Sequence, residues 1–170
     1  MIDRRRAVGF ALAALSAACL LSASLAHAEQ AFRRFLPLLI DLDGWQGKKP
    51  DGMTMEMSND SMTTATRDYQ RGNTQLHASI IIGQAAAAAL APSRAGMKIE
   101  TSDGHVITST INGLSVTKTF NIQSKSGSIM VALGPAAVLS ISYTGMSEDE
   151  ALPLAQKFDW KAIQAAAQVK

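Results

Sequence analysis

Cysteine is almost absent from the 170-residue sequence, in which Cys19 is the only one. A disulfide within the chain is therefore excluded, and so are metal sites built from paired cysteines. The familiar catalytic signatures are missing as well, since there is no G-x-S-x-G, no H-E-x-x-H and no phosphate-binding glycine loop. With only three histidines in the chain, we expect a protein that is not an enzyme and that carries no cofactor.

Long apolar runs are lacking too, except near the N-terminus. Arginines at positions 4–6 precede an apolar stretch that leads to Ala26-His27-Ala28, a small-x-small cleavage site. This order predicts a cleavable signal peptide over residues 1–28 and a single domain over residues 29–170, located in the periplasm or secreted. Two alternatives stay open, namely a lipoprotein anchored at Cys19 and twin-arginine export directed by the arginine cluster.

An excess of charge is missing from the predicted mature domain. The chain has 16 Lys and Arg against 14 Asp and Glu, and the signal segment holds three of the basic residues and one acidic residue. The remaining 13 of each give a formal net charge of zero, which offers no electrostatic reason to expect nucleic acid as a partner. No stretch after the signal approaches the roughly 20 apolar residues that span a bilayer, so we expect no transmembrane segment there.

Short apolar runs between turn residues dominate what is present. Residues 97–144 predict an antiparallel meander of five strands rich in Ile, Val, Thr and Leu. The breaks between these strands are Asp103-Gly104, Asn112-Gly113, Lys125-Ser126-Gly127 and Gly134-Pro135. Alternating patterns earlier in the chain predict three further strands, at Met53–Met57, Met62–Gln70 and Thr74–Ile82.

Helix signals flank these strands. A short helix is expected from Pro37 to Leu42, and an alanine-rich helix from Gln84 to Ala91 that stops before Pro92. A capping box with Ser147 as N-cap begins a C-terminal helical segment, which ends in a helix from Trp160 to about Ala167. The predicted fold is α+β: a single antiparallel sheet of about eight strands, with a middle helix and a C-terminal helical segment on one face.

Turn types predict the register of the meander. If Asn112-Gly113 is a two-residue turn, Ile111 opposes Leu114. If residues 102–104 form a three-residue loop, Ile99 opposes Ile107. Both choices place the apolar side chains on one face of the sheet.

The same register produces the first candidate ligand-binding site, His105 and Lys118. It places His105 opposite Phe120 and Lys118 opposite Ile107, with both polar side chains on the inner face. Because burying an unpaired lysine is costly, either a carboxylate or an anion-binding pocket receives Lys118, or the strand slips at a bulge. A lysine that reaches past the sheet edge is a further structural explanation.

Methionines at every second position suggest a second candidate site, for a soft metal. On a strand, Met53, Met55 and Met57 project from one face, and a turn at Asn59-Asp60 would place Met62 opposite Met57. Thioether sulfurs suit Cu(I), and His77 on the next strand would add a nitrogen ligand. The structural alternative is that these methionines pack in the core of a half-buried strand.

Trp45 is the third candidate, in a loop over residues 45–52 that is interrupted by Gly47, Pro50 and Gly52. An exposed indole in such a loop often marks a binding surface. Alternatively, the indole covers the end of the core.

The turn residues also carry a resemblance. They are Asp103-Gly104-His105, Thr110-Ile111-Asn112-Gly113, Lys125-Ser126-Gly127-Ser128-Ile129, Gly145-Met146-Ser147 and Asp159-Trp160. Their order resembles a group of uncharacterised exported bacterial proteins and lipoproteins, sheet-plus-helix modules with no known activity. The resemblance implies export and the α+β fold, and it adds no chemistry. This chain departs from the pattern at His105, where an aromatic residue is expected.

Two functions follow as hypotheses. The first is an exported non-catalytic envelope protein that binds a partner protein or a small ligand, through the open face of the sheet or the Trp45 loop. The second is a periplasmic copper-binding protein that uses the methionine strand. A hydrolase would require a pocket that brings a histidine together with an acid and a serine.

Overall fold

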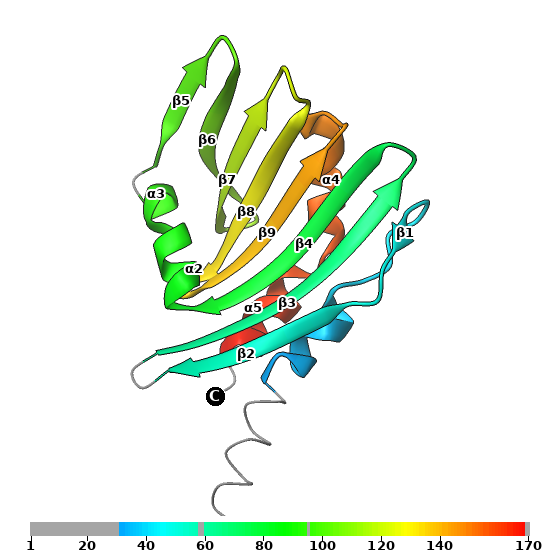
Figure 1. The fold of residues 1–170 in the computed structure, drawn as a ribbon. Coiled ribbons are helices and arrows are strands. Elements are labelled where there is room, and N and C mark those ends of the chain that lie inside the picture. The colour runs from blue at the N-terminus through cyan, green and yellow to red at the C-terminus, as the bar shows by residue number, and fades with distance from the viewer. Residues whose placement is uncertain (1–30, 58–59, 95, 169–170) are drawn as a thin grey trace, which may run out of the picture.

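A computed structural model describes residues 31–57, 60–94 and 96–168 of the chain. The predicted signal peptide, including Cys19, lies outside these residues. The described part holds one sheet of nine strands in the order β1-β3-β4-β9-β8-β7-β6-β5, with β2 also paired to β3 (Figure 1). Every pair of neighbouring strands is antiparallel. The predicted class, α+β with a single antiparallel sheet, is confirmed.

The elements have the following bounds. The strands are β1 (Gln46–Gly47), β2 (Asp51–Met57), β3 (Asp60–Arg71), β4 (Thr74–Gly83), β5 (Lys98–Thr101), β6 (Gly104–Ile111), β7 (Leu114–Asn121), β8 (Ser126–Gly134) and β9 (Ala137–Thr144). The helices are the 3-10 helix η1 (Arg33–Leu38) and the α-helices α2 (Gln84–Ala89), α3 (Ala91–Arg94), α4 (Glu148–Lys157) and α5 (Trp160–Gln168).

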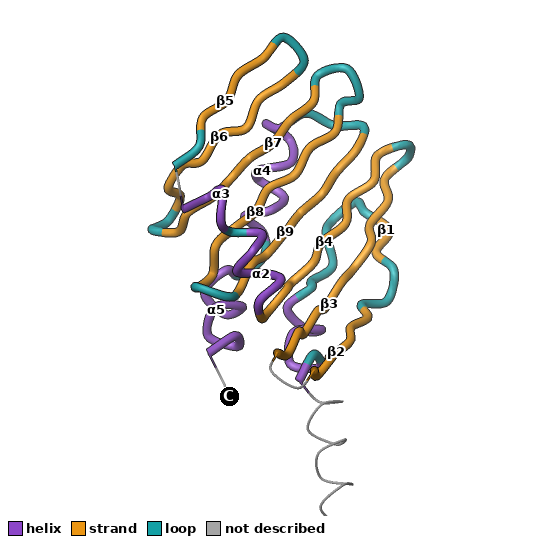
Figure 2. The backbone as a smooth tube through the Cα atoms, turned by 60° about the vertical axis from the view of Figure 1, so that its left-hand side comes forward, coloured by secondary structure: helices purple, strands orange, loops and turns teal. Residues whose placement is uncertain are grey.

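The inner face of the sheet carries the main core, because alternate residues of the central strands are apolar. Ile80 of β4, Leu139 of β9 and Val131 of β8 have no exposed surface and pack with side chains of η1, α4 and α5. Figure 2 shows the two C-terminal helices together on this side of the sheet. The outer face has only a small apolar cluster, in which Ala86 and Leu90 cover Val138.

The helices are thus divided between the two faces. The middle helical segment, α2 and α3, packs on the outer face, whereas the sequence placed it on the same face as the C-terminal segment. Ile81, Met130 and Ala132 explain this position, since they add apolar surface to one end of the outer face. The other end of the outer face is left without a covering helix.

Helix boundaries differ from expectation where proline was the guide. The helix predicted to begin at Pro37 is instead a 3-10 helix that contains Pro37 and ends one residue later. Pro92 does not end the middle segment, because it lies within α3 after a break at Leu90. The capping box at Ser147 is confirmed, and Asp159 caps α5 by accepting a hydrogen bond from the Ala162 amide at 2.9 Å.

The register is confirmed at one turn and corrected at two. Ile111 opposes Leu114, as the Asn112-Gly113 turn predicts. Thr101 opposes Gly104, so the β5–β6 turn has two residues and not three, and Ile99 pairs with Val106. Because a slip of one residue reverses the face, Ile99 is 47% exposed and not in the core.

The second correction concerns the first hairpin. Met57 opposes Asp60, so Met62 lies opposite Met55 and not opposite Met57. Among the described helices, none combines the length and the apolar character needed to cross a membrane.

Candidate functional site

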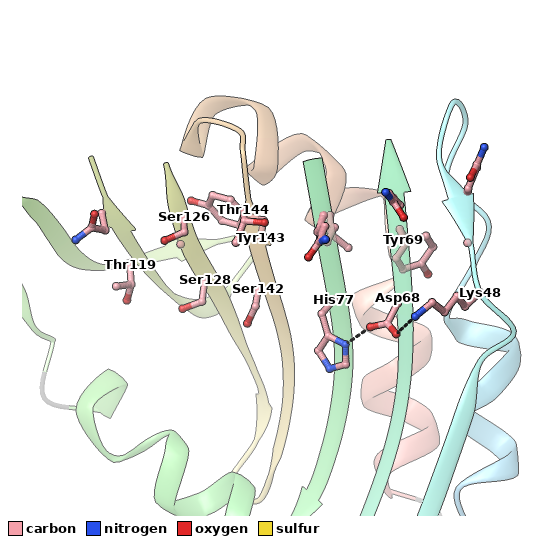
Figure 3. A pocket seen from close by; sticks show the side chains of 17 residues that line it. Lys48, Asp68, Tyr69, His77, Thr119, Ser126, Ser128, Ser142, Tyr143 and Thr144 are labelled. Carbon is pink, nitrogen blue, oxygen red and sulfur yellow. Dashed lines mark hydrogen bonds and ion pairs between the residues drawn. The ribbon is translucent and has the colours of Figure 1, made fainter. Parts of the chain in front are cut away.

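Two rows of polar side chains cross the uncovered end of the outer face. The first row runs from β7 to the loop after β1 through directly opposed residues. Its members are Thr119, Ser128, Ser142, His77, Asp68 and Lys48 (Figure 3). The second row lies beside it, two residues along each strand, and consists of Asn121, Ser126, Thr144, Gln75, Gln70 and Gln46. We call these the upper polar rows.

The rows line a groove of about 830 Å³. That volume lies within the range of small-molecule sites, roughly 300–1,000 Å³. Most such sites are lined by apolar side chains, whereas most of the lining residues here carry a hydroxyl or an amide, although carbon atoms still make up more of the lining surface than polar atoms do. Tyr69 and Tyr143 contribute to the groove from strands whose aromatic rings lie on the inner face, where Tyr69 packs on Phe158.

The charged part of the groove is a chain of three side chains. Asp68 accepts hydrogen bonds from His77 Nδ1 at 2.7 Å and from Lys48 Nζ at 3.2 Å. The hydrogen bond from His77 is the main cause that lowers the pKa of Asp68 from its ordinary value, and burial opposes it. The carboxylate therefore stays ionised and fixes the imidazole with Nδ1 toward Asp68, which leaves Nε2 for a ligand.

The hydroxyls of the first row are not used by the protein. Within the described ranges, no hydrogen bond joins the side chains of Thr119, Ser128 or Ser142 to another protein group. Ser142 stands directly opposite His77, yet no hydrogen bond connects the two. The groove thus presents donors and acceptors in a fixed spacing, set by the sheet.

His105 and Lys118 come together, but outside the groove. Glu148, the first residue of α4, accepts hydrogen bonds from His105 Nε2 at 2.5 Å and from Lys118 Nζ. The register is unbroken at Lys118, which opposes Ile107 and Ile129. The charge of Lys118 is therefore compensated by a carboxylate, and the strand has no bulge at this position.

This Glu148 cluster is largely enclosed, with side chains 15–26% exposed. Burial favours the neutral acid, but the hydrogen bonds from Lys118 and His105 outweigh it and lower the pKa of Glu148. Burial also raises the pKa of the adjacent Tyr143 to about 12, with a further contribution from Glu148. The anion expected at His105 and Lys118 is thus supplied by the chain itself.

Trp45 is buried and only 9% exposed, and the Arg71 guanidinium lies 4.6 Å from the centre of its ring. It belongs to the main core beside η1, which matches the alternative that the indole covers the end of the core. Its exposed surface is too small to serve as a binding surface by itself.

The methionines and His77 share the outer face but lie apart. Met62 opposes Gly83 at the end of β4, whereas His77 lies six residues away along that strand. At about 3.3 Å per residue the separation is roughly 20 Å, beyond the reach of a common metal ion. His77 is therefore part of the groove and not of the methionine group.

The sequence predictions include His77 but not Asp68, Glu148 or the other members of the upper polar rows. The signal for the rows was present, because Ser, Thr and Gln alternate with apolar residues in β4, β8 and β9. Which polar positions meet depends on strand order, since β4 pairs with β9 and not with β5, the next strand along the chain.

Comparison with known proteins gives no relative from which a function could be inferred. No family model, no curated protein and no solved structure matches this chain. The resemblance to exported bacterial proteins and lipoproteins therefore stays a prediction, and any functional argument depends on the groove itself.

Proposed function

We propose that the protein is an exported, non-catalytic binding protein that holds a small, uncharged, hydroxyl-rich ligand, such as a mono- or disaccharide, in the groove of the upper polar rows. The supporting observation is the pair of cross-strand rows that line about 830 Å³ with hydroxyls and amides. Each of these groups can both donate and accept hydrogen bonds, as the hydroxyls of a sugar do. Export depends on residues 1–28 and is part of the proposal.

The charged members of the groove have a positioning role in this proposal. Asp68 neutralises Lys48 and orients His77, so the site offers an imidazole Nε2 without a net attraction for anions. Ser142 and Ser128 are neighbours on adjacent strands, and their hydroxyls can bind adjacent oxygens of one ligand. The floor of strands is rigid, which limits the entropy lost on binding.

A titration followed by amide NMR tests the proposal with a panel of neutral mono- and disaccharides. At least one is expected to shift amides of β4, β8 and β9. Replacing Ser128 and Ser142 together by Ala should weaken that binding about tenfold, because each lost hydrogen bond contributes roughly 0.5–1.5 kcal/mol. Thr110→Ala is the control, since Thr110 is exposed on the same face but does not line the groove.

The panel result can contradict the proposal in two ways. If no sugar shifts the groove amides at millimolar concentration, the ligand class is wrong. If a sugar binds equally well to wild type and to the double variant, binding takes place elsewhere on the protein.

Hydrolysis is the second candidate, because the groove brings His77, Asp68 and Ser142 together. Asp68 orients the imidazole as the acid of a catalytic triad does. A serine nucleophile must form a hydrogen bond with its base to be activated. Ser142 forms no hydrogen bond with His77, so binding is favoured over hydrolysis. Turnover of a nitrophenyl ester by wild type that disappears in Ser142→Ala would favour the enzyme.

A further inference from the structure

The methionine strip on β2 and β3 is the strongest feature that the groove leaves unexplained. It consists of Met53, Met55 and Met57 of β2 and Met62 of β3. The β2 residues between them face the core side, since Gly52 opposes the buried Ala65 and the Thr54 hydroxyl lies 3.2 Å from that of Thr63. The methionines therefore project from the outer face.

Packing does not account for the strip. Met53, Met55 and Met57 are 48%, 41% and 63% exposed, and they are three of the five large apolar side chains that are exposed in the described residues. None of them belongs to either apolar cluster, whereas Met146 is 3% exposed in the main core. The alternative that these methionines fill a half-buried strand is thus wrong for β2.

The strip brings its sulfurs within reach of one another. Met55 and Met62 are directly opposed, which places their Cβ atoms about 4.5–5.5 Å apart. Met53 and Met57 are the next residues on the same face, roughly 7 Å along β2 on either side. A methionine has three rotatable bonds, so its sulfur can turn toward a neighbour without a change in the backbone.

The strip is open on the side of β2, whereas Met62 of β3 is partly buried. β2 pairs only with β3 among the described strands and forms an edge of the sheet (Figure 1). On the other side Met62 opposes Gly83, which has no side chain to cover it. The part of the chain that the structure describes holds no group of three His, Cys, Asp or Glu side chains suited to a metal. A metal site at the strip would therefore depend mainly on its thioethers, with Asp60 directly opposite Met57 in the register.

We propose that the methionine strip is a Cu(I) site, with Met55 and Met62 as the central ligands and Met53 or Met57 completing the coordination. Neutral, soft thioethers select Cu(I) over the harder divalent ions, which need imidazole or carboxylate ligands. An exposed edge strand lets the ion enter and leave without unfolding. The strip is separate from the groove, so the proposal of a Cu(I) site does not depend on the ligand proposed for the groove.

Anaerobic titration of the full chain with Cu(I) against a chromophoric Cu(I) chelator tests this site. Every protein in the experiment carries Cys19→Ser, because a thiol would bind Cu(I) by itself. We expect one Cu(I) per chain. Met55→Leu with Met62→Leu should weaken binding at least tenfold, and the matched pair Met97→Leu with Met130→Leu should leave it unchanged.

A second measurement identifies the ligands directly. With methyl-labelled methionine, Ag(I) as a diamagnetic substitute for Cu(I) should shift the methyl signals of the strip and leave those of Met97, Met130 and Met146 in place. Leucine conserves volume on an exposed face, so circular dichroism should show all variants folded. Failure to take Cu(I) from the chelator, or unchanged binding by Met55→Leu with Met62→Leu, overturns the proposal.

Discussion

Replacing Glu148 by Gln removes one negative charge from between Lys118 and His105 while keeping the size of the side chain. The hydrogen bonds from these two residues tie the first turn of α4 to β6 and β7. The substitution leaves an ammonium group that is only 18% exposed without its counter-charge. We expect loss of stability without loss of the fold.

The magnitude follows from two lost contributions. The Lys118 ammonium can still donate a hydrogen bond to the oxygen of Gln, so the loss at Lys118 is the attraction between opposite charges. For a partly buried pair this is about 1.5 kcal/mol, between about 0–1 for exposed pairs and about 3–5 for buried ones. An acid in the first turn of a helix adds roughly 0.3–1 kcal/mol through the dipole. The sum is about 2 kcal/mol, less than the roughly 3–5 for breaking a fully buried pair, because Glu148 remains 15% exposed. In a domain of this size, the melting temperature should fall by about 6 °C.

The pH dependence supplies a second readout. Since the folded pKa of Glu148 lies below its ordinary value of 4.5, its carboxylate stabilises the fold above that pH. This contribution is lost as the pH falls through the folded pKa. The difference in unfolding free energy between wild type and Glu148→Gln should therefore be full at pH 7 and shrink below about pH 4.5.

Urea denaturation at pH 7 and at pH 4 measures the difference in unfolding free energy between wild type and Glu148→Gln. Asp149→Asn is the matched control, because Asp149 lies in the same first turn but forms no ion pair in the described structure, so it should lose only the dipole contribution. A Glu148→Gln variant within about 0.5 kcal/mol of wild type at pH 7, or a difference that is the same at pH 4 and pH 7, would refute the reasoning.

Four further substitutions test other parts of the fold by urea denaturation. Arg67→Ala removes a guanidinium that donates to the Leu39 and Lys48 carbonyls and should cost about 2 kcal/mol, whereas Asp41→Asn should cost under about 0.5 because that carboxylate is 91% exposed. Ser147→Ala removes the N-cap of α4 and should cost about 1 kcal/mol. Gly127→Ala would place a Cβ 2.2 Å from a backbone oxygen of β7, so we expect at least about 2 kcal/mol and a strand that must shift.

Local turn chemistry explains where sequence reasoning succeeded. Asn112 and Gly113 both have positive φ, 53° and 81°, as a two-residue hairpin turn requires. Few residue pairs adopt that conformation, so the dipeptide determines the register of β6 and β7. The same holds for the capping box at Ser147, which depends on residues only three positions apart.

Register failed where no buried face constrains it. All four residues of β5 are exposed, so its apolar pattern carries little information, and Asp103-Gly104 was compatible with a loop of two or three residues. A slip of one position in an exposed edge strand costs little folding free energy, because no buried side chains are moved out of the core. The turn at the tip of the first hairpin was displaced for the same reason, since β2 exposes its methionines.

The candidate sites depend on contacts between distant residues. Lys118 was recognised as a buried cation that requires compensation, but Glu148 lies 30 residues later. Its helix could have covered either face of the sheet. Likewise, the groove forms because β9 returns to pair with β4, and the residue types in the two strands do not specify that pairing.

The Glu148 cluster links the completion of the sheet to the docking of the C-terminal helices. The segment that ends at Thr144 contains every described strand of the sheet but lacks the carboxylate that receives Lys118. Docking of α4 both covers Lys118 and brings it the carboxylate of Glu148, which lies 30 residues later in the chain. The last helices thus complete the sheet electrostatically as well as covering it.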